Sequence, residues 1–147
     1  MSMEKLLISA CLAGENCKYS GGNNFIGEEM LASLKDKYEL VSVCPEVMGG
    51  LSVPRIPCER IGGKVMNERG EDVTAQFKTG AELTANICES QDIKKALLKE
   101  KSPSCGSGRI YDGTFSHTVI AGDGVTAERL RALGVALYGE SEIEKLL

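Results

Sequence analysis

The sequence predicts an α/β protein: a single Rossmann-like domain with an open, mostly parallel sheet, helices on both faces of the sheet, and a small hairpin insertion. Two observations lead to this prediction. Short apolar runs, typical of buried strands, alternate along the chain with longer segments of helical spacing. The chain has 147 residues, 42% hydrophobic and 26% charged, without a repeat or low-complexity linker. One domain spanning residues 1–147 is therefore expected.

The first half of the chain contains two predicted strands with a helix between them. Residues 5–10 form a short, continuous apolar run, as in a buried parallel strand. Residues 11–24 are rich in Gly, Asn and Ser and predict an ordered loop. Apolar residues at helical spacing predict a helix over residues 25–38, and residues 39–43 predict the second strand. Two prolines and a Gly pair exclude a long regular element over residues 44–55.

The middle of the chain adds a hairpin, a helix and a third strand. Gly-containing turns predict a hairpin or a pair of short strands over residues 60–73. Apolar residues share one helical face over residues 74–90, and residues 93–98 predict the third strand. The Gly-rich segment 106–114 predicts a loop or a small hairpin. Residues 119–121 predict a short strand or the entry to the next helix.

The last three predicted elements are a helix, a strand and a short helix, over residues 127–133, 135–138 and 141–147. Thr126 is the expected N-cap of the first of these, and Gly134 is expected to end it. Ser141 is the expected cap of the terminal helix. This alternation of strands and helices is typical of a parallel sheet covered on both faces.

Charge and cysteine content exclude some classes of function and favour others. The net charge of −4 disfavours a stable complex with DNA or RNA, because such a complex usually needs a basic face. The apolar run near the N-terminus is too short for a signal peptide or membrane span, so we expect a cytoplasmic protein that does not bind membranes. A monomer is expected, because no long exposed apolar helix stands out. The six cysteines should stay reduced, which favours metal binding, catalysis or burial.

Three cysteines follow predicted strands at the points where the strands end. Cys11 follows residues 5–10, Cys44 follows residues 39–43, and Cys105 comes shortly after residues 93–98. The carboxyl ends of parallel strands meet at one edge of a sheet, where ligands bind. Three thiols gathered there would suit zinc or an iron–sulfur cluster. The alternative is that they are merely buried thiols, which are common in proteins. Cys17 is either an additional ligand, a replacement for one of the three, or a neighbouring thiol.

Other polar residues fall at the same predicted edge. Glu46, two residues past Cys44, is either a general base beside a metal or a carboxylate that favours a helix N-terminus. Ser102 and Ser104 either satisfy loop backbone groups or donate hydrogen bonds to a substrate. Arg55 would contact an anionic group or remain a solvated surface charge. We interpret the remaining candidates as structural: Cys88 in the core, Cys58 partly buried, and His117 on the surface or hydrogen-bonded.

Several motifs together resemble the thiouracil desulfidase family. They are Ser9-Ala10-Cys11-Leu12-Ala13-Gly14 with Cys17-Lys18-Tyr19, Cys44-Pro45-Glu46-Val47-Met48-Gly49-Gly50-Leu51 with Pro54-Arg55, Ser102-Pro103-Ser104-Cys105-Gly106, and Gly124-Val125-Thr126-Ala127. The match runs nearly end to end. Lys18 and Ser20 stand where arginine and aspartate are common in the family.

The resemblance implies a 4Fe-4S cluster held by only three cysteines, which are Cys11, Cys44 and Cys105 by motif. It implies Glu46 and Ser102 as catalytic residues. We add Ser104, Gly106 and Arg55 as predicted substrate-binding residues. The implied substrates are 4-thiouracil, 2-thiouracil or 4-thiouridine monophosphate, which would be converted without net redox change to the oxo pyrimidine and hydrosulfide, as in nucleotide salvage. A non-catalytic iron–sulfur module and a zinc-binding module are the alternatives.

Overall fold

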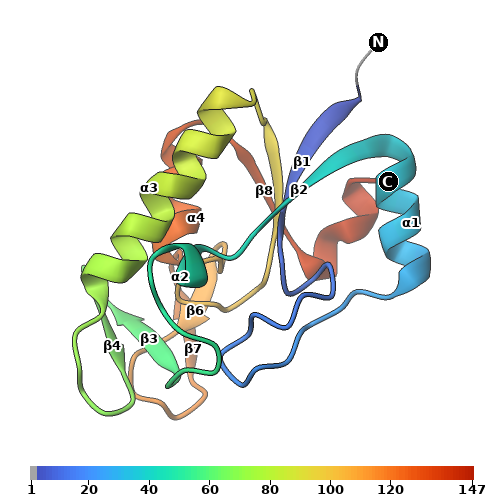
Figure 1. The fold of residues 1–147 in the computed structure, drawn as a ribbon. Helices are drawn as coiled ribbons and strands as arrows, with labels where there is room; N and C mark the ends of the chain where they lie inside the picture. The colour runs from blue at the N-terminus through green and yellow to red at the C-terminus, as the bar shows by residue number, and fades with distance from the viewer. Residues whose placement is uncertain (1–2) are drawn as a thin grey trace.

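The computed structural model describes residues 3–147 and shows a four-stranded parallel sheet in the order β2-β1-β5-β8 (Figure 1). Its strands are β1 (Glu4–Ser9), β2 (Tyr38–Val43), β5 (Lys95–Leu98) and β8 (Ala136–Gly139). All three strand pairs are parallel. The predicted α/β fold with an open parallel sheet is confirmed.

Helices cover both faces of this sheet (Figure 1). The helices α3 (Thr74–Ser90) and α4 (Val125–Ala132) pack on one face, around a core that includes Leu7, Ala85, Ala96 and Leu130. The helix α1 (Glu28–Lys37) and the 3-10 helix η1 (Glu140–Lys145) cover the other face, over Leu6, Ile8, Leu34 and Ile143. Successive residues of β1 therefore alternate between the two cores, as a strand buried on both faces requires.

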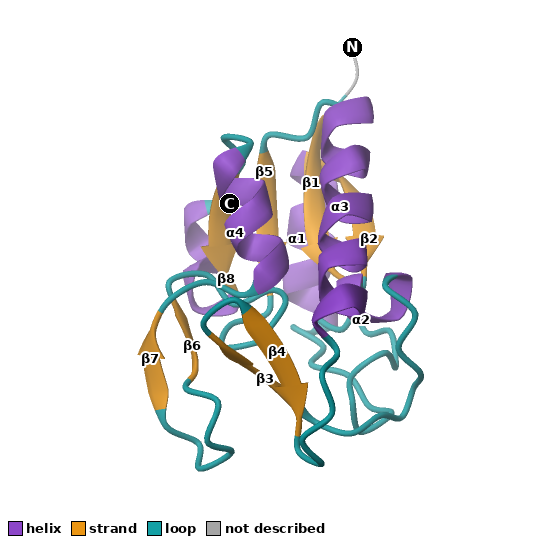
Figure 2. Cartoon of the chain, turned by 90° about the vertical axis from the view of Figure 1, so that its left-hand side faces the viewer, coloured by secondary structure: helices purple, strands orange, loops and turns teal. Residues whose placement is uncertain are grey.

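Two antiparallel hairpins lie beyond the ends toward which the sheet strands run (Figure 2). The first joins β3 (Cys58–Ile61) to β4 (Lys64–Asn67), and the second joins β6 (Arg109–Tyr111) to β7 (Val119–Ala121). The predicted hairpin insertion is confirmed, although its first strand begins two residues earlier than expected. Residues 106–114 do not form a hairpin by themselves: they contribute only β6, which pairs with β7, the short strand predicted over residues 119–121. Both hairpins therefore lie on the side of the sheet where the loops after β1, β2 and β5 begin.

The segment over residues 44–55 contains no long regular element, as expected, but it does contain the short helix α2 (Pro45–Met48), with Glu46 in its first turn. Pro45 occupies its first turn, where the missing backbone N–H is not needed. The helix packs backbone to backbone on α3: a Cβ added to Gly80 would lie 1.9 Å from the Pro45 carbonyl oxygen, and one added to Gly49 would lie 2.0 Å from that of Gln76. These two glycines therefore allow α2, which carries Glu46, to sit directly on α3.

Some predicted boundaries and caps were wrong. The helix expected over residues 25–38 begins at Glu28, because Gly27 has a φ of 98° that a helix does not accommodate. Tyr38 belongs instead to β2, where its buried hydroxyl donates to the Leu146 carbonyl at 2.8 Å. Gly124, not Thr126, is the N-cap of α4. Ser141 lies inside η1, which begins one residue earlier.

The part of the chain that the structure describes contains no helix long and apolar enough to cross a membrane.

Candidate functional site

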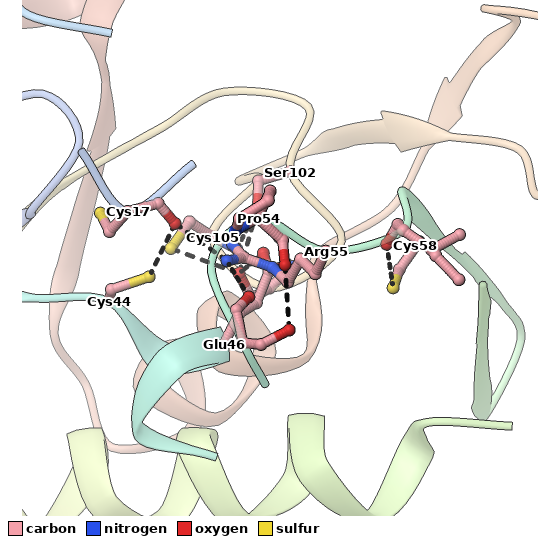
Figure 3. A network of polar contacts seen from close by, with 11 residues as sticks. Cys17, Cys44, Glu46, Pro54, Arg55, Cys58, Ser102 and Cys105 are labelled. Atoms are coloured by element: carbon pink, nitrogen blue, oxygen red, sulfur yellow. Dashed lines mark hydrogen bonds and ion pairs between the residues drawn. The ribbon is translucent and has the colours of Figure 1, made fainter. Parts of the chain in front are cut away.

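Folding gathers four cysteines at the carboxyl end of the sheet. Cys11 lies two residues beyond β1, Cys44 directly follows β2, and Cys105 lies in the loop after β5. The fourth, Cys17, comes from the loop after β1, and its carbonyl accepts a hydrogen bond from Cys44 Sγ at 3.8 Å (Figure 3). The predicted convergence of the first three residues thus occurs, with Cys17 beside them.

The thiols influence one another electrostatically. Burial raises the pKa of Cys11, a hydrogen bond with Asn24 opposes that shift, and the Cys44 thiol raises it further. Burial and the neighbouring Cys44 raise the pKa of Cys17 to about 12. Burial raises the pKa of Cys105 to about 12, while hydrogen bonds with Ser9 and Ser104 act in the opposite direction. Without a bound cation, the thiols of Cys11, Cys17 and Cys105 are therefore held in their neutral form.

This donor set fits an iron–sulfur cluster. Its soft sulfur ligands lie at the same end of the sheet, Cys105 buried and Cys11, Cys17 and Cys44 half-buried. A bound metal would supply the positive charge that converts such thiols to thiolates. Within residues 3–147, no three His, Cys, Asp or Glu side chains converge closely enough to hold a single metal ion. In a cluster each thiolate binds a different iron atom, so its ligands are spaced more widely than those of one ion.

Glu46, on the first turn of α2, has a partner for each carboxylate oxygen. Its Oε1 accepts a hydrogen bond from Arg55 Nε at 3.1 Å, and its Oε2 accepts one from Ser104 Oγ at 2.8 Å (Figure 3). Arg55 also donates from Nη1 to the carbonyls of Cys17 and Ser52, at 3.0 and 3.2 Å. The arginine therefore connects Glu46 to the loop that carries Cys17, and it is not a solvated surface charge.

The loop from Ser102 to Gly106 is held by its own hydrogen bonds. Ser102 Oγ accepts from the backbone N–H groups of Ser104 and Cys105, at 3.2 and 3.1 Å, and lies 3.0 Å from Ser104 Oγ. The Gly106 N–H donates to the Ser102 carbonyl at 2.9 Å. A Cβ on Gly106 would lie 2.7 Å from that same carbonyl oxygen, so only glycine fits there without a shift. Ser102 is thereby fixed in place beside Cys105.

A cavity of about 520 Å³ lies between this loop, the segment after α2 and the two hairpins. Glu46, Arg55 and Ser102 line it, whereas Ser104 and Gly106 are buried behind its wall. The remaining lining residues are Lys18, Tyr19, Asn24, Pro57, Cys58, Glu59, Glu68, Lys99, Glu100, Lys101, Pro103, Tyr111, Phe115 and His117. This volume lies within the range of about 300–1,000 Å³ that is typical of small-molecule binding sites.

Sequence reasoning missed the far wall of this cavity. Tyr111, Phe115 and His117 come from the β6–β7 hairpin, where neither spacing nor a motif pointed to a site. The buried carboxylate of Glu59 holds their loop by accepting from the N–H groups of Gly113 and Phe115, at 2.9 and 3.2 Å.

Two residues that we interpreted as structural occupy this region. His117 is exposed, as expected, but it also lines the cavity. Cys58 lines the cavity on the other side of Glu46 and Arg55 from the Cys17, Cys44 and Cys105 sulfurs (Figure 3). Burial and the Glu46 carboxylate raise the pKa of Cys58 to about 12. Cys88 is buried in the core, as predicted.

Comparison with known proteins assigns the family. Residues 6–142 match the family described as 2-thiouracil desulfurase. The chain belongs to this family. It is similar to the uncharacterized protein YbbK of Bacillus subtilis (strain 168), with 40% identity over 97% of this chain and 99% of that protein. A solved structure of the [4Fe-4S]-dependent thiouracil desulfidase TudS is also similar, with a TM-score of 0.93, 46% identity, and coverage of 97% of this chain and 95% of that one. The resemblance to the desulfidase family is confirmed.

Proposed function

We propose that this protein is a thiouracil desulfidase with a 4Fe-4S cluster. It would replace the thiocarbonyl sulfur of a thiolated uracil by oxygen from water and release hydrosulfide, without net electron transfer. The observation that carries this proposal is the position of Glu46, which lines the cavity and also acts electrostatically on Cys105, one of the gathered thiols. Membership of the 2-thiouracil desulfurase family and the likeness to TudS support it.

Cys11, Cys44 and Cys105 are the proposed cluster ligands, one from the end of each of three neighbouring strands. A cluster bound by three thiolates supplies a thiophilic Lewis-acid site at its remaining iron. Cys17 is the alternative to Cys44, because the two residues contact each other. A zinc module or a non-catalytic iron–sulfur module would use the same thiols without requiring Glu46.

Glu46 and Ser102 are the proposed catalytic residues, because both present polar atoms to the cavity. A carboxylate beside the substrate cavity can accept a proton from water, and Arg55 Nε holds the Glu46 side chain in that position. Ser102 Oγ, fixed by two backbone N–H donors, would hold the attacking water or transfer its proton. The hydrolysis is therefore assigned to the residues of this chain that lie next to the thiols.

The cavity suits a substrate larger than a free base. Its 520 Å³ exceed the volume of one pyrimidine ring, so 4-thiouridine monophosphate is a candidate beside 4-thiouracil and 2-thiouracil. Lys18 and Lys101 line it and would favour a phosphate group, and Arg55 would contact the substrate from the same wall. Ser104 and Gly106 would act on the substrate through the Ser102 loop. A role in cytoplasmic nucleotide salvage, as a monomer, completes the proposal.

Anaerobic purification followed by iron, sulfide and zinc analysis and a desulfuration assay tests this function. The proposal expects about four irons per chain and loss of thiocarbonyl absorbance with 4-thiouracil or 4-thiouridine monophosphate, matched by released hydrosulfide. Stoichiometric zinc would point to the zinc module. A full complement of iron without hydrosulfide release from any of the three substrates would point to the non-catalytic module.

A further inference from the structure

Ser104 occupies the only hydrogen-bonded path between the two proposed catalytic residues among residues 3–147. Its Oγ lies 2.8 Å from Glu46 Oε2 and 3.0 Å from Ser102 Oγ. Ser104 itself is 1% exposed and does not line the cavity, whereas Ser102 and Glu46 do. A buried hydroxyl thus joins two polar groups that both face the substrate cavity.

The donors and acceptors available fix which group donates in each of these two hydrogen bonds. The Glu46 carboxylate beside Arg55 is an acceptor, so the single hydroxyl proton of Ser104 is donated to it. Ser104 Oγ must then accept the proton of Ser102, whose own oxygen already accepts two backbone N–H groups. Cys105 Sγ, at 3.6 Å from Ser104 Oγ, is the weaker competitor, because a hydrogen bond to a carboxylate oxygen at 2.8 Å is short and charge-assisted.

We propose that Ser104 is a positioning residue that passes a proton between Ser102 and Glu46; this inference rests on the proposed desulfidase function. As water attacks the thiocarbonyl carbon, one water O–H bond breaks. That proton moves to Ser102 Oγ, onto the lone pair that the longer of its two backbone hydrogen bonds, from the Ser104 N–H at 3.2 Å, releases. Ser102 releases its own proton to Ser104 Oγ, and Ser104 releases its own to Glu46 Oε2. A carbon–oxygen bond forms, both serines remain neutral, and the negative charge of Glu46 passes to the substrate sulfur.

The same path operates in reverse when sulfur departs. The proton on Glu46 returns through Ser104 and Ser102 to the substrate sulfur. The carbon–sulfur bond then breaks, its electron pair leaves with hydrosulfide, and the remaining hydroxyl proton is lost as the carbonyl forms. Thiocarbonyl and water thus give carbonyl, hydrosulfide and one proton, and no oxidant or reductant is needed.

Kinetics of Ser104→Ala in cluster-loaded protein test this inference. Under anaerobic single-turnover conditions with 4-thiouracil, we expect the rate constant at saturating substrate to fall about 100-fold, the typical contribution of a proton transfer, with substrate affinity changed less than about threefold. Ser102→Ala/Ser104→Ala should be about as slow as Ser102→Ala alone, because residues that act as a unit are not additive. In mixtures of H₂O and D₂O, a plot of the rate against deuterium fraction should be curved for wild type, because several protons move in one step. The same plot should be linear for Ser104→Ala, in which the path is interrupted.

Ser107→Ala is the matched control, because Ser107 lies in the same loop but bonds Arg131. The inference is overturned if Ser104→Ala slows active enzyme less than about fivefold, or if the two serine substitutions multiply their effects. It is also overturned if Ser104→Ala changes the cluster absorption spectrum, since its hydroxyl would then serve Cys105. Wild-type enzyme that releases no hydrosulfide contradicts the proposed function instead.

A second measurement needs no turnover. The carboxyl ¹³C resonance of Glu46, identified by its loss in Glu46→Gln, should shift when Ser102 is replaced by alanine. That shift should vanish when Ser104 is alanine as well, because the path is then interrupted. A resonance that responds to Ser102→Ala equally in both backgrounds overturns the inference, whether or not the protein desulfurates thiouracil.

Discussion

Glu46 Oε1 and Arg55 Nε form an ion pair of 3.1 Å in which both side chains are largely withdrawn from solvent, with exposed fractions of 14% and 7%. Breaking a buried pair by removing one partner leaves an uncompensated charge and typically costs about 3–5 kcal/mol. We therefore expect Arg55→Met to lower the free energy of unfolding by about that amount, measured by denaturant titration under anaerobic conditions.

A double-mutant cycle with Glu46→Gln separates the pair from simple loss of packing. Arg55→Met should cost much less in the Glu46→Gln background, where no carboxylate is left unpaired. Glu128→Gln is the control, because it removes an exposed partner of Arg60 and should cost about 0–1 kcal/mol. Additive effects of Arg55→Met and Glu46→Gln would show that the two residues are not coupled.

Single cysteine-to-serine substitutions should identify the cluster ligands. Cys11→Ser, Cys44→Ser and Cys105→Ser should each lose most bound iron, because three ligands are the minimum that the proposal allows. Cys58→Ser should keep the wild-type iron content, because the Cys58 sulfur lies apart from those of Cys17, Cys44 and Cys105 in Figure 3. Iron and sulfide analysis provides the measurement. If Cys17→Ser loses the cluster and Cys44→Ser retains it, the assignment of Cys44 is wrong.

Gly80→Ala should displace α2 and with it Glu46. An added Cβ would lie 1.9 Å from the Pro45 carbonyl oxygen, which is backbone and cannot move alone. Overpacking of this kind costs about 1–3 kcal/mol or more, so we expect a lower free energy of unfolding together with slower desulfuration. Gly63→Ala is the control, because nothing lies within 4 Å of its added Cβ. Wild-type stability and rate in Gly80→Ala would contradict the close packing of α2 on α3.

Cys88, which is not a proposed ligand, should make a pH-dependent contribution to stability. Burial, and secondarily Glu89, raise the pKa of the Cys88 thiol from its ordinary value of 9.0 to about 11. The folded state therefore favours the neutral thiol, and its contribution is complete below pH 9 and is lost as the pH rises from 9 through 11. The free energy of unfolding should fall over this interval more steeply in wild type than in Cys88→Ala, by at most about 1.4 kcal/mol per pH unit. Parallel curves in urea titrations would show that burial does not raise the pKa of Cys88.

The sheet, and the position of Cys11, Cys44 and Cys105 at its carboxyl end, could be predicted from the sequence because both depend on local patterns of apolar residues. Short apolar runs specify buried strands, and parallel strands bring their carboxyl ends together. The helix α2 was anticipated only through Glu46, as a carboxylate that favours a helix N-terminus. Its close backbone contact with α3 through Gly49 and Gly80 is something that no periodicity reveals.

The far side of the cavity was not predictable for a similar reason. Phe115 reaches it from a hairpin loop in which its own φ is 57° and its N–H is held by Glu59, a residue more than fifty positions away in the chain. Ser104 was recognised by motif, but its place between Ser102 and Glu46 depends on how α2 meets the loop after β5. Such contacts between distant segments are set by packing, not by residue spacing.

The most direct test is the rate of hydrosulfide release by anaerobically purified Glu46→Gln with 4-thiouracil or 4-thiouridine monophosphate, normalised to iron content. Our account predicts that wild type releases one hydrosulfide per substrate consumed and that Glu46→Gln keeps its iron but is at least about 100-fold slower. Glu68→Gln, which also removes a carboxylate that lines the cavity, should stay near wild type. Iron-loaded wild-type protein that releases no hydrosulfide, or a Glu46→Gln variant as fast as wild type, would contradict it.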